Sequence, residues 1–212
     1  MKKILFIVVF TLIYAGSTKA QQIYFGPKVG GNLSHFMYNG DNTNFFDTKK
    51  MKLASHIGAF VEIQINDFFA VQPELLYSIK GARFNISTEN EFESRYVFKY
   101  LSLPVLAKYY VSKKVSIEVG PQFAYLLSAK NIEKSDLYSS NLGEEAASVN
   151  IKDTMQVYDL GVTAGVGYIT DTGFYMTARY NIGLSNIYKD VPNTQNVLKN
   201  GAIQLSVGFS ME

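Results

Sequence analysis

The last eleven residues of the chain, "AIQLSVGFSME" (202–212), alternate strictly between apolar and small or polar side chains. The odd positions from 203 to 211 carry Ile, Leu, Val, Phe and Met, whereas the even positions from 204 to 210 carry Gln, Ser, Gly and Ser. Successive side chains of a β-strand point to opposite faces, so this segment has one apolar face and one polar face. The apolar face must contact either a protein core or lipid, and the rest of the sequence decides between the two.

Seven further segments repeat the pattern, and together they predict eight strands. Each has about the nine to eleven residues that a tilted strand needs to cross a membrane, or more. The predicted strands are residues 23–34, 53–65, 68–80, 96–110, 115–128, 158–169, 174–185 and the closing segment 202–212.

The connections between these segments alternate in length. Short connections fall at about residues 66–67, 112–114 and 171–173, and the last of them contains a turn signal, Asp171-Thr172-Gly173. Long connections fall at about residues 36–50, 81–95, 129–156 and 187–197. Outer-membrane barrels have even strand numbers, short periplasmic turns and long extracellular loops. The sequence therefore predicts an all-β, eight-stranded antiparallel up-and-down transmembrane β-barrel with both termini in the periplasm.

The two faces of the predicted strands differ in charge. One face carries almost no charge, and Lys99 is its ambiguous exception. A soluble up-and-down barrel, the alternative fold, would face its apolar residues inward and would need no alternation of short and long connections. The interior of an eight-stranded membrane barrel is just wide enough for side chains to fill it, so the charged face is predicted to form a paired, structural network in the lumen. That network comprises Lys28, His56, Glu62, Glu74, Lys80, Lys108, Glu118, Asp159 and Arg179.

Aromatic residues gather beside the short connections, where the interface of a membrane with the periplasm would lie. This predicted girdle comprises Phe68, Phe69, Tyr109, Tyr110, Tyr168, Phe174 and Phe209. The sequence closes on Phe209-Ser210-Met211-Glu212, so Phe209 or Met211 is the expected contact of the last strand with the barrel-assembly machinery.

The N-terminus, "MKKILFIVVFTLIYAGSTKAQQ", has two lysines, an apolar stretch and then Thr18-Lys19-Ala20. This order predicts a secretory signal peptide over residues 1–20 that is cleaved near Ala20, leaving residues 21–212 as the barrel domain of the cell outer membrane. The chain has no cysteine, which excludes both a disulfide framework and a lipoprotein attachment site. Without the signal, 17 basic residues face 18 acidic ones, so the charge gives no indication of nucleic-acid binding.

Five blocks of sequence also resemble a known family. They are "YFGPKVGGNLS" (24–34), "VQPELLYSIKG" (71–81), "YLSLPVLAKYY" (100–110), "VGPQFAYLLSAK" (119–130) and "ARYNIGLSNI" (178–187). In order and spacing they are similar to the outer-membrane β-barrel family of Bacteroidetes that includes PorT-like proteins. The resemblance implies a membrane barrel without catalytic residues. Because PorT itself is associated with the type IX secretion machinery, the resemblance also implies a partner in that machinery.

The sequence offers little for catalysis. The neighbours Ser34 and His35 would point to opposite faces of a strand, and His56 is expected to be a hydrogen-bonded lumen residue. Carboxylates are also present in the predicted loop 81–95, at Glu89, Glu91 and Glu93, where a solvated loop face is the simpler interpretation. We therefore expect no enzyme, although an enzyme acting on membrane lipid stays a less favoured alternative.

No cofactor or metal is predicted. The stretches "GDNTNFFD" (40–47) and "EKSD" (133–136) lack the ligand spacing of a calcium loop, and "GVGYITDTG" (165–173) lacks the third glycine and the helix of a nucleotide site.

The long connections are the expected place for contact with partners. The connection 36–50 contains aromatic residues that could bind a ligand or pack over the barrel mouth, namely Phe36, Tyr38, Phe45 and Phe46. The expected partners are outer-membrane lipid, the barrel-assembly machinery and either a secretion component or a surface ligand. The favoured function is a structural or partner-binding membrane protein, and the alternative is a cell-surface binder of the adhesin type.

Overall fold

The computed structural model describes residues 22–39, 52–87, 91–135, 147–187, 189 and 197–212 of the chain. These described residues form nine β-strands and one short 3-10 helix. The elements are β1 (Ile23–Asn39), β2 (Lys52–Gln64), β3 (Phe69–Ser87), β4 (Glu91–Tyr110), β5 (Val115–Ser135), β6 (Ala147–Asn150), η1 (Lys152–Thr154), β7 (Tyr158–Ile169), β8 (Phe174–Gly183) and β9 (Val197–Phe209).

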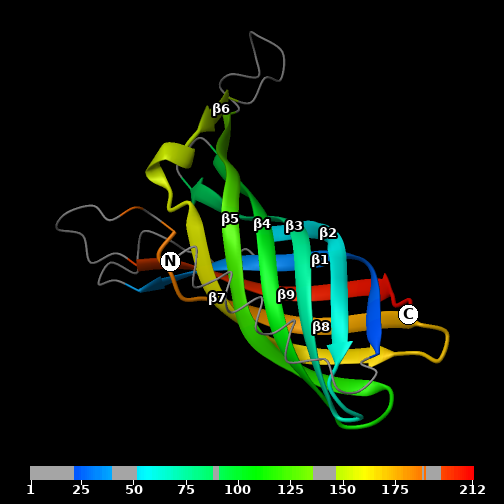
Figure 1. Ribbon diagram of the computed structural model, residues 1–212. Coiled ribbons are helices and arrows are strands. Elements are labelled where there is room, and N and C mark those ends of the chain that lie inside the picture. Colours follow the sequence, from blue (N-terminus) through cyan, green and yellow to red (C-terminus); the bar gives the residue numbers. More distant parts are fainter. Residues whose placement is uncertain (1–21, 40–51, 88–90, 136–146, 188, 190–196) are drawn as a thin grey trace.

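Eight of the described strands close into an antiparallel ring in the order β1-β2-β3-β4-β5-β7-β8-β9. The ring is sealed where β9 pairs with β1, with Val29 opposite Val207. In Figure 1, the front wall formed by β2 to β5 crosses the direction of β1, β9 and β8 behind it, as the tilted strands of a small barrel do. The predicted eight-stranded antiparallel barrel is therefore confirmed.

The outward face of the ring is apolar on every wall. In β9 the alternation that predicted the strand is visible in the exposure of its side chains: Leu205 is 56% exposed, whereas the neighbouring Gln204 is 4% exposed. We call the outward-facing set the apolar belt. It includes Phe25, Val29, Ile57, Val61, Leu75, Tyr77, Leu101, Leu103, Ile117, Val119, Phe123, Tyr125, Leu127, Leu160, Val166, Met176, Ile182, Ile203, Leu205 and Val207.

Three tight turns and the two ends of the described chain lie at one end of the barrel. Asn66 stabilises the β2–β3 turn because its side-chain oxygen accepts hydrogen bonds from the backbone N–H groups of Phe68 and Phe69, each at 2.9 Å. The β7–β8 turn places Gly173 at φ 83°, a conformation that favours glycine. The two ends meet where Phe25 pairs with Met211.

Five of the seven predicted girdle aromatics face outward at this end of the barrel, and Phe69 packs against Tyr109 with ring centroids 5.2 Å apart. Phe68, in the β2–β3 turn, is exposed but lines the hollow at the barrel end. Tyr110 is the second exception. It alternates with Tyr109 and therefore points inward, where its hydroxyl donates a hydrogen bond to Glu62. Its assignment to the girdle is wrong because the predicted girdle placed two neighbouring residues on one face.

The long connections at the other end are shorter than predicted. β3 and β4 stay paired up to Ser87 and Glu91, so most of the predicted loop 81–95 is a strand hairpin that contains Glu91 and Glu93. Likewise β1 continues to Asn39 and β5 to Ser135, and β9 begins at Val197. The hydrophobic alternation fades in these extensions, which is why the sequence pattern ended too early. They lie beyond the belt, where no apolar environment selects an apolar face.

A β-bulge in β5 changes which side chains face inward. Lys99 pairs with Ser128 but Tyr100 pairs with Leu126, so Leu127 is an extra residue in β5. Before the bulge the even-numbered residues face inward, and after it Ala129 is buried and Lys130 is exposed. Ser128 is therefore half-buried at the bulge and does not continue the inward face of β5.

The segment from β6 to β7 runs along a single edge of β5. β6 pairs with the upper part of β5, β7 pairs with its lower part, and η1 lies between them as an inward excursion. This excursion places Met155 over the upper mouth of the barrel, in contact with side chains of the lumen.

Candidate functional site

The barrel interior is the most chemically distinctive part of the molecule. Each of the nine residues of the predicted network is buried there and no more than 8% exposed. Four cations balance four carboxylates, which matters because a buried charge is tolerated when it is paired and hydrogen-bonded. The nine residues are Lys28, His56, Glu62, Glu74, Lys80, Lys108, Glu118, Asp159 and Arg179.

Arg179 of β8 is the centre of this network. Its Nε lies 2.7 Å from Oε2 of Glu118 on β5, and its Nη1 lies 2.9 Å from Oε2 of Glu74 on β3. Glu74 also accepts from Nζ of Lys28 on β1, at 3.0 Å. A guanidinium presents several donors in a fixed plane, so it can serve two carboxylates at once. The cluster therefore braces four strands across the lumen.

Lys108 extends the network toward the end with the short turns. Its Nζ lies 2.6 Å from Oε2 of Glu62, 2.9 Å from Oε1 of Gln72 and 3.6 Å from Oε1 of Glu118. Through the contact with Glu118, Lys108 is electrostatically coupled to Arg179. The lower half of the lumen is therefore one continuous polar network.

The fourth predicted pair is looser. Nζ of Lys80 is 4.0 Å from Oδ2 of Asp159 and 5.3 Å from the centroid of the Tyr100 ring. Asp159 accepts shorter hydrogen bonds from Asn200, at 2.7 Å, and from Ser185, at 2.9 Å. Asp159 is therefore satisfied largely by neutral donors.

His56 lies between a serine and an asparagine. Its Nδ1 is 2.8 Å from Oδ1 of Asn32, and its Nε2 is 2.9 Å from Oγ of Ser206. Gly30 makes this placement possible, because a Cβ at that position would lie 2.5 Å from the imidazole. The order Ser–His–Asn matches the roles of a nucleophile, a base and an orienting group, but all three residues are at most 4% exposed. A substrate would have to enter the packed lumen to reach Ser206.

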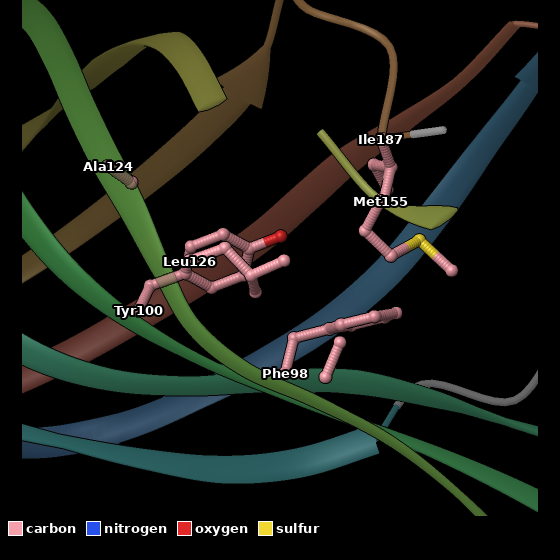
Figure 2. Packing of buried hydrophobic residues seen from close by; sticks show 7 residues of the cluster. Phe98, Tyr100, Ala124, Leu126, Met155 and Ile187 are labelled. Carbon is pink, nitrogen blue, oxygen red and sulfur yellow. The ribbon is translucent and has the colours of Figure 1, made fainter. Parts of the chain in front are cut away.

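An apolar cluster closes the other end of the lumen. We call it the apolar lid. Figure 2 shows the Met155 side chain directed toward the ring of Phe98, with Ile187 beside it. These residues come from β4, β5, the residue directly after η1 and the segment after β8. The lid comprises Phe98, Tyr100, Ala124, Leu126, Ala129, Met155 and Ile187.

Network and lid leave little open space between them. A cavity of about 10 Å³ lies beside Lys80, Asp159 and Asn200, which is about enough for one water molecule. At the end with the short turns, a larger hollow of about 800 Å³ is open to the outside. We call it the bowl. Glu62 and Tyr110 are among its lining residues, together with residues of all three turns.

Sequence reasoning missed several interior residues. Tyr175 donates to Glu118 at 2.7 Å, and the carboxyamide of Gln72 donates to Glu74 at 2.6 Å. Both occupy inward positions of strands that were predicted correctly, so strict alternation from Glu74 and Arg179 was the signal for them. The apolar lid had no such signal, because the predicted inward face was identified by its polarity.

The predicted loop contacts have mixed outcomes. Phe36 and Tyr38 belong to β1 and not to a loop, opposite Asn200 and Leu198 of β9. Phe45 and Phe46 lie outside the described residues, as do Glu89 and the predicted signal peptide. Ser34 faces inward, and His35 stacks on Tyr180 of the outer face, so the two cannot form a dyad.

The described part of the chain contains neither a metal-binding cluster nor a membrane-spanning helix. No group of three or more His, Cys, Asp or Glu residues is placed there to hold a metal ion. No helix within the described ranges has the length and apolar character needed to cross a membrane.

A closed ring with an apolar outer belt and a charged, fully paired interior defines the class of the protein: it is a transmembrane β-barrel. The chain belongs to the outer membrane protein beta-barrel domain family, whose sequence model matches residues 19–189. It is therefore a small outer-membrane protein, with its short turns on the periplasmic side and the apolar lid on the extracellular side.

Solved structures with a similar fold include bacterial outer-membrane barrels. Ail of Yersinia pestis, in complex with the heparin analogue sucrose octasulfate, is 16% identical over 90% of this chain and 99% of that chain, with a TM-score of 0.49. Neisserial surface protein A is 13% identical over 90% and 99%, with a TM-score of 0.45. OprG of Pseudomonas aeruginosa is 9% identical over 91% and 97%, with a TM-score of 0.46. A comparison with curated protein sequences gives no match.

Proposed function

We propose that this barrel does not transport solutes but anchors a binding surface in the outer membrane. The observation that carries the proposal is the occluded lumen. Arg179 and Lys108 bind their carboxylates across its lower half, the apolar lid covers its upper half, and a cavity of about 10 Å³ lies within. A barrel filled in this way can act as a scaffold, so its activity belongs to the parts outside the membrane.

The extracellular end supports binding to a macromolecule. β3, β4 and β5 have 19, 20 and 21 residues, about twice the number that a strand needs to cross the membrane. In Figure 1 these strands and β6 rise beyond the rest of the barrel as a one-sided sheet. β6 pairs with β5 along one edge, and the described residues provide no strand for its other edge. Unpaired backbone groups at such an edge can accept an added strand from a partner.

The test of this proposal is to shorten the sheet without opening the barrel. Residues 84–94 would be replaced by Asn-Gly, which suits a two-residue hairpin turn between Arg83 and Arg95. A photo-crosslinker at Val149 of β6 should give a protein adduct on intact cells. The shortened chain, which keeps β6 paired with β5, shows how much of that adduct depends on the β3–β4 extension. The same crosslinker at Leu205 of the apolar belt is the control. Absence of a protein adduct at Val149 in the full-length chain, or an equal protein adduct at Leu205, would remove the sheet as the binding surface.

A supporting role in protein export is the second candidate. It rests on the resemblance to PorT-like proteins, and the periplasmic bowl of about 800 Å³ favours it because a periplasmic partner needs a concave surface on that side. Deleting the gene should then retain a class of secreted proteins in the periplasm. An unchanged set of proteins in the culture medium would exclude this role and leave binding at the cell surface, including an adhesin-type function.

We also propose that the protein is not an enzyme. The packing around Ser206 supports this, because the Ser206–His56–Asn32 arrangement has no path to a lipid or peptide substrate within the described residues. A fluorophosphonate probe should therefore fail to label the folded protein. Labelling that disappears in Ser206→Ala would show that the serine is a nucleophile after all.

The remaining proposals concern maturation and partners. We propose cleavage near Ala20, for which the mass of the mature protein is the test: it should correspond to a chain that begins at Gln21. We propose outer-membrane lipid and the barrel-assembly machinery as the general partners of this barrel. We propose no binding of nucleic acid, cofactor or metal ion.

A further inference from the structure

Lys99 was the one charged residue that the sequence placed on the apolar face, and nothing in the proposed function explains it. In the structure it is half-buried between the inward-facing Phe98 and Tyr100, and it pairs with Ile79 of β3 and Ser128 of β5. Lys99 therefore points outward. It lies near the extracellular limit of the apolar belt, two residues above Leu101 on the same face of β4.

Two more lysines lie near this part of the outer face, each placed by an irregularity of the backbone. The bulge at Leu127 turns Lys130 from the lumen to the outer face, where it lies diagonally across from Lys99, because Lys130 pairs with Val97 and Lys99 pairs with Ser128. The segment after β6 follows β5 downward, with the N–H of Ile151 bonded to the carbonyl of Ala129 at 3.0 Å, and so brings Lys152 to β5 beside the outward-facing Tyr125. We call Lys99, Lys130 and Lys152 the lysine triad.

The lysine triad sits directly on the aromatic edge of the belt. Nζ of Lys152 lies 5.7 Å from the centroid of the outward-facing Tyr125 ring, and Tyr125 makes an edge contact with Tyr158 at 5.6 Å between centroids. Aromatic rings and long basic side chains both favour the boundary between acyl chains and headgroups. The position of the triad is therefore at headgroup depth in the outer leaflet.

Among the side chains that the structure describes, which exclude those of residues 82–95 and 133–135, no carboxylate forms an ion pair with a member of the triad, whereas the lumen cations are paired with carboxylates. Three like charges on neighbouring positions at the edge of an apolar surface repel one another and are costly to desolvate. An anion bound between them would relieve both penalties. Lysine ammonium groups are common ligands of phosphate.

We propose that the lysine triad binds the phosphate headgroup of an anionic lipid in the outer leaflet, with the acyl chains of that lipid lying on the belt below. The apolar belt continues without a break through Leu101 and Tyr125 to the triad, so a ligand with an acyl chain fits better than a soluble anion. This inference rests on the location in the outer membrane and is independent of any partner of the extracellular sheet.

The test uses the folded barrel in neutral detergent, titrated with phosphatidylglycerol or phosphatidylcholine and followed by native mass spectrometry. A basic residue near a membrane surface is worth about a fivefold gain in affinity for anionic lipid, so replacing all three lysines by glutamine should weaken phosphatidylglycerol binding on the order of 100-fold. Phosphatidylcholine binding should not change. Replacing all three by arginine should preserve the preference, because the charge remains.

Controls separate a specific site from net charge. Lys199→Gln removes an outward-facing lysine from β9, on another wall at the same end of the barrel, and should leave lipid binding as it is. Inorganic phosphate at the concentration of the lipid should not compete. The proposal is overturned if the glutamine triple variant, folded by gel mobility, keeps the wild-type preference for phosphatidylglycerol. It is equally overturned if Lys199→Gln reduces that preference as much, or if free phosphate displaces the lipid.

Discussion

At the scale of single residues, Arg179 has the largest predicted effect on stability. Arg179→Met would leave Glu74 and Glu118 facing each other with fewer donors in a buried site, at a cost of about 3–5 kcal/mol in the free energy of unfolding. Urea unfolding in lipid vesicles, followed by the faster gel migration of the unboiled barrel, measures this cost. Lys80→Met is the matched control and should cost clearly less, because Asp159 keeps its bonds to Asn200 and Ser185. Equal losses would contradict the ranking.

A second prediction at this scale concerns the periplasmic turns, where Lys114 lies 2.5 Å from Asp171. The hydrogen bond and the charge of Asp171 raise the pKa of Lys114 above its ordinary value. Because the folded-state pKa is raised, the contribution of the pair is present at neutral pH and is lost as the pH rises through the pKa of Lys114. An NMR titration of the Lys114 side chain should show this raised pKa, and Asp171→Asn should return it to the ordinary range. An unchanged titration in Asp171→Asn would contradict the pairing.

At the scale of the elements, the orientation of each strand can be tested by charge. Val119 of β5 is 50% exposed in the middle of the apolar belt, so Val119→Arg should destabilise the barrel by about 2–4 kcal/mol in lipid vesicles. Val149→Arg, on β6 beyond the belt, is the control and should be tolerated. If Val119→Arg folded as well as the wild type, the inward and outward faces would be assigned the wrong way round.

The strands within the membrane were predictable from sequence because lipid selects apolar side chains on the outer face and the polar lumen selects polar and charged side chains on the inner face. The pattern of Ile203, Leu205 and Val207 is sufficient to predict the membrane-spanning part of β9 and which of its side chains face outward. The same logic fails for residues 81–95, since both faces of the β3–β4 extension lie outside the membrane. It also fails at Leu127, because one inserted residue leaves the local composition unchanged but reverses every side chain that follows.

At the scale of the whole molecule, the sequence was sufficient to predict the number of strands in the ring and which face of each strand is apolar and which is charged. It was also sufficient to predict the residues of the lumen network. Which carboxylate binds which cation was not, because partners such as Lys28 and Glu74 lie 46 positions apart and meet only when the ring closes. The apolar lid was not predictable either, since Met155 and Ile187 come from segments that the sequence presented as loops.

The central claim is that the barrel is closed and its lumen is occluded, and conductance across a planar lipid bilayer tests it most directly. Purified wild-type protein, shown to be folded by its gel mobility, should insert without steady conductance steps above the baseline in potassium chloride. Arg179, Glu74 and Lys28 fill the path that ions would take, and Met155 covers it. Reproducible steps from the wild-type protein would show that the lumen conducts and would contradict the proposal of a non-transporting scaffold.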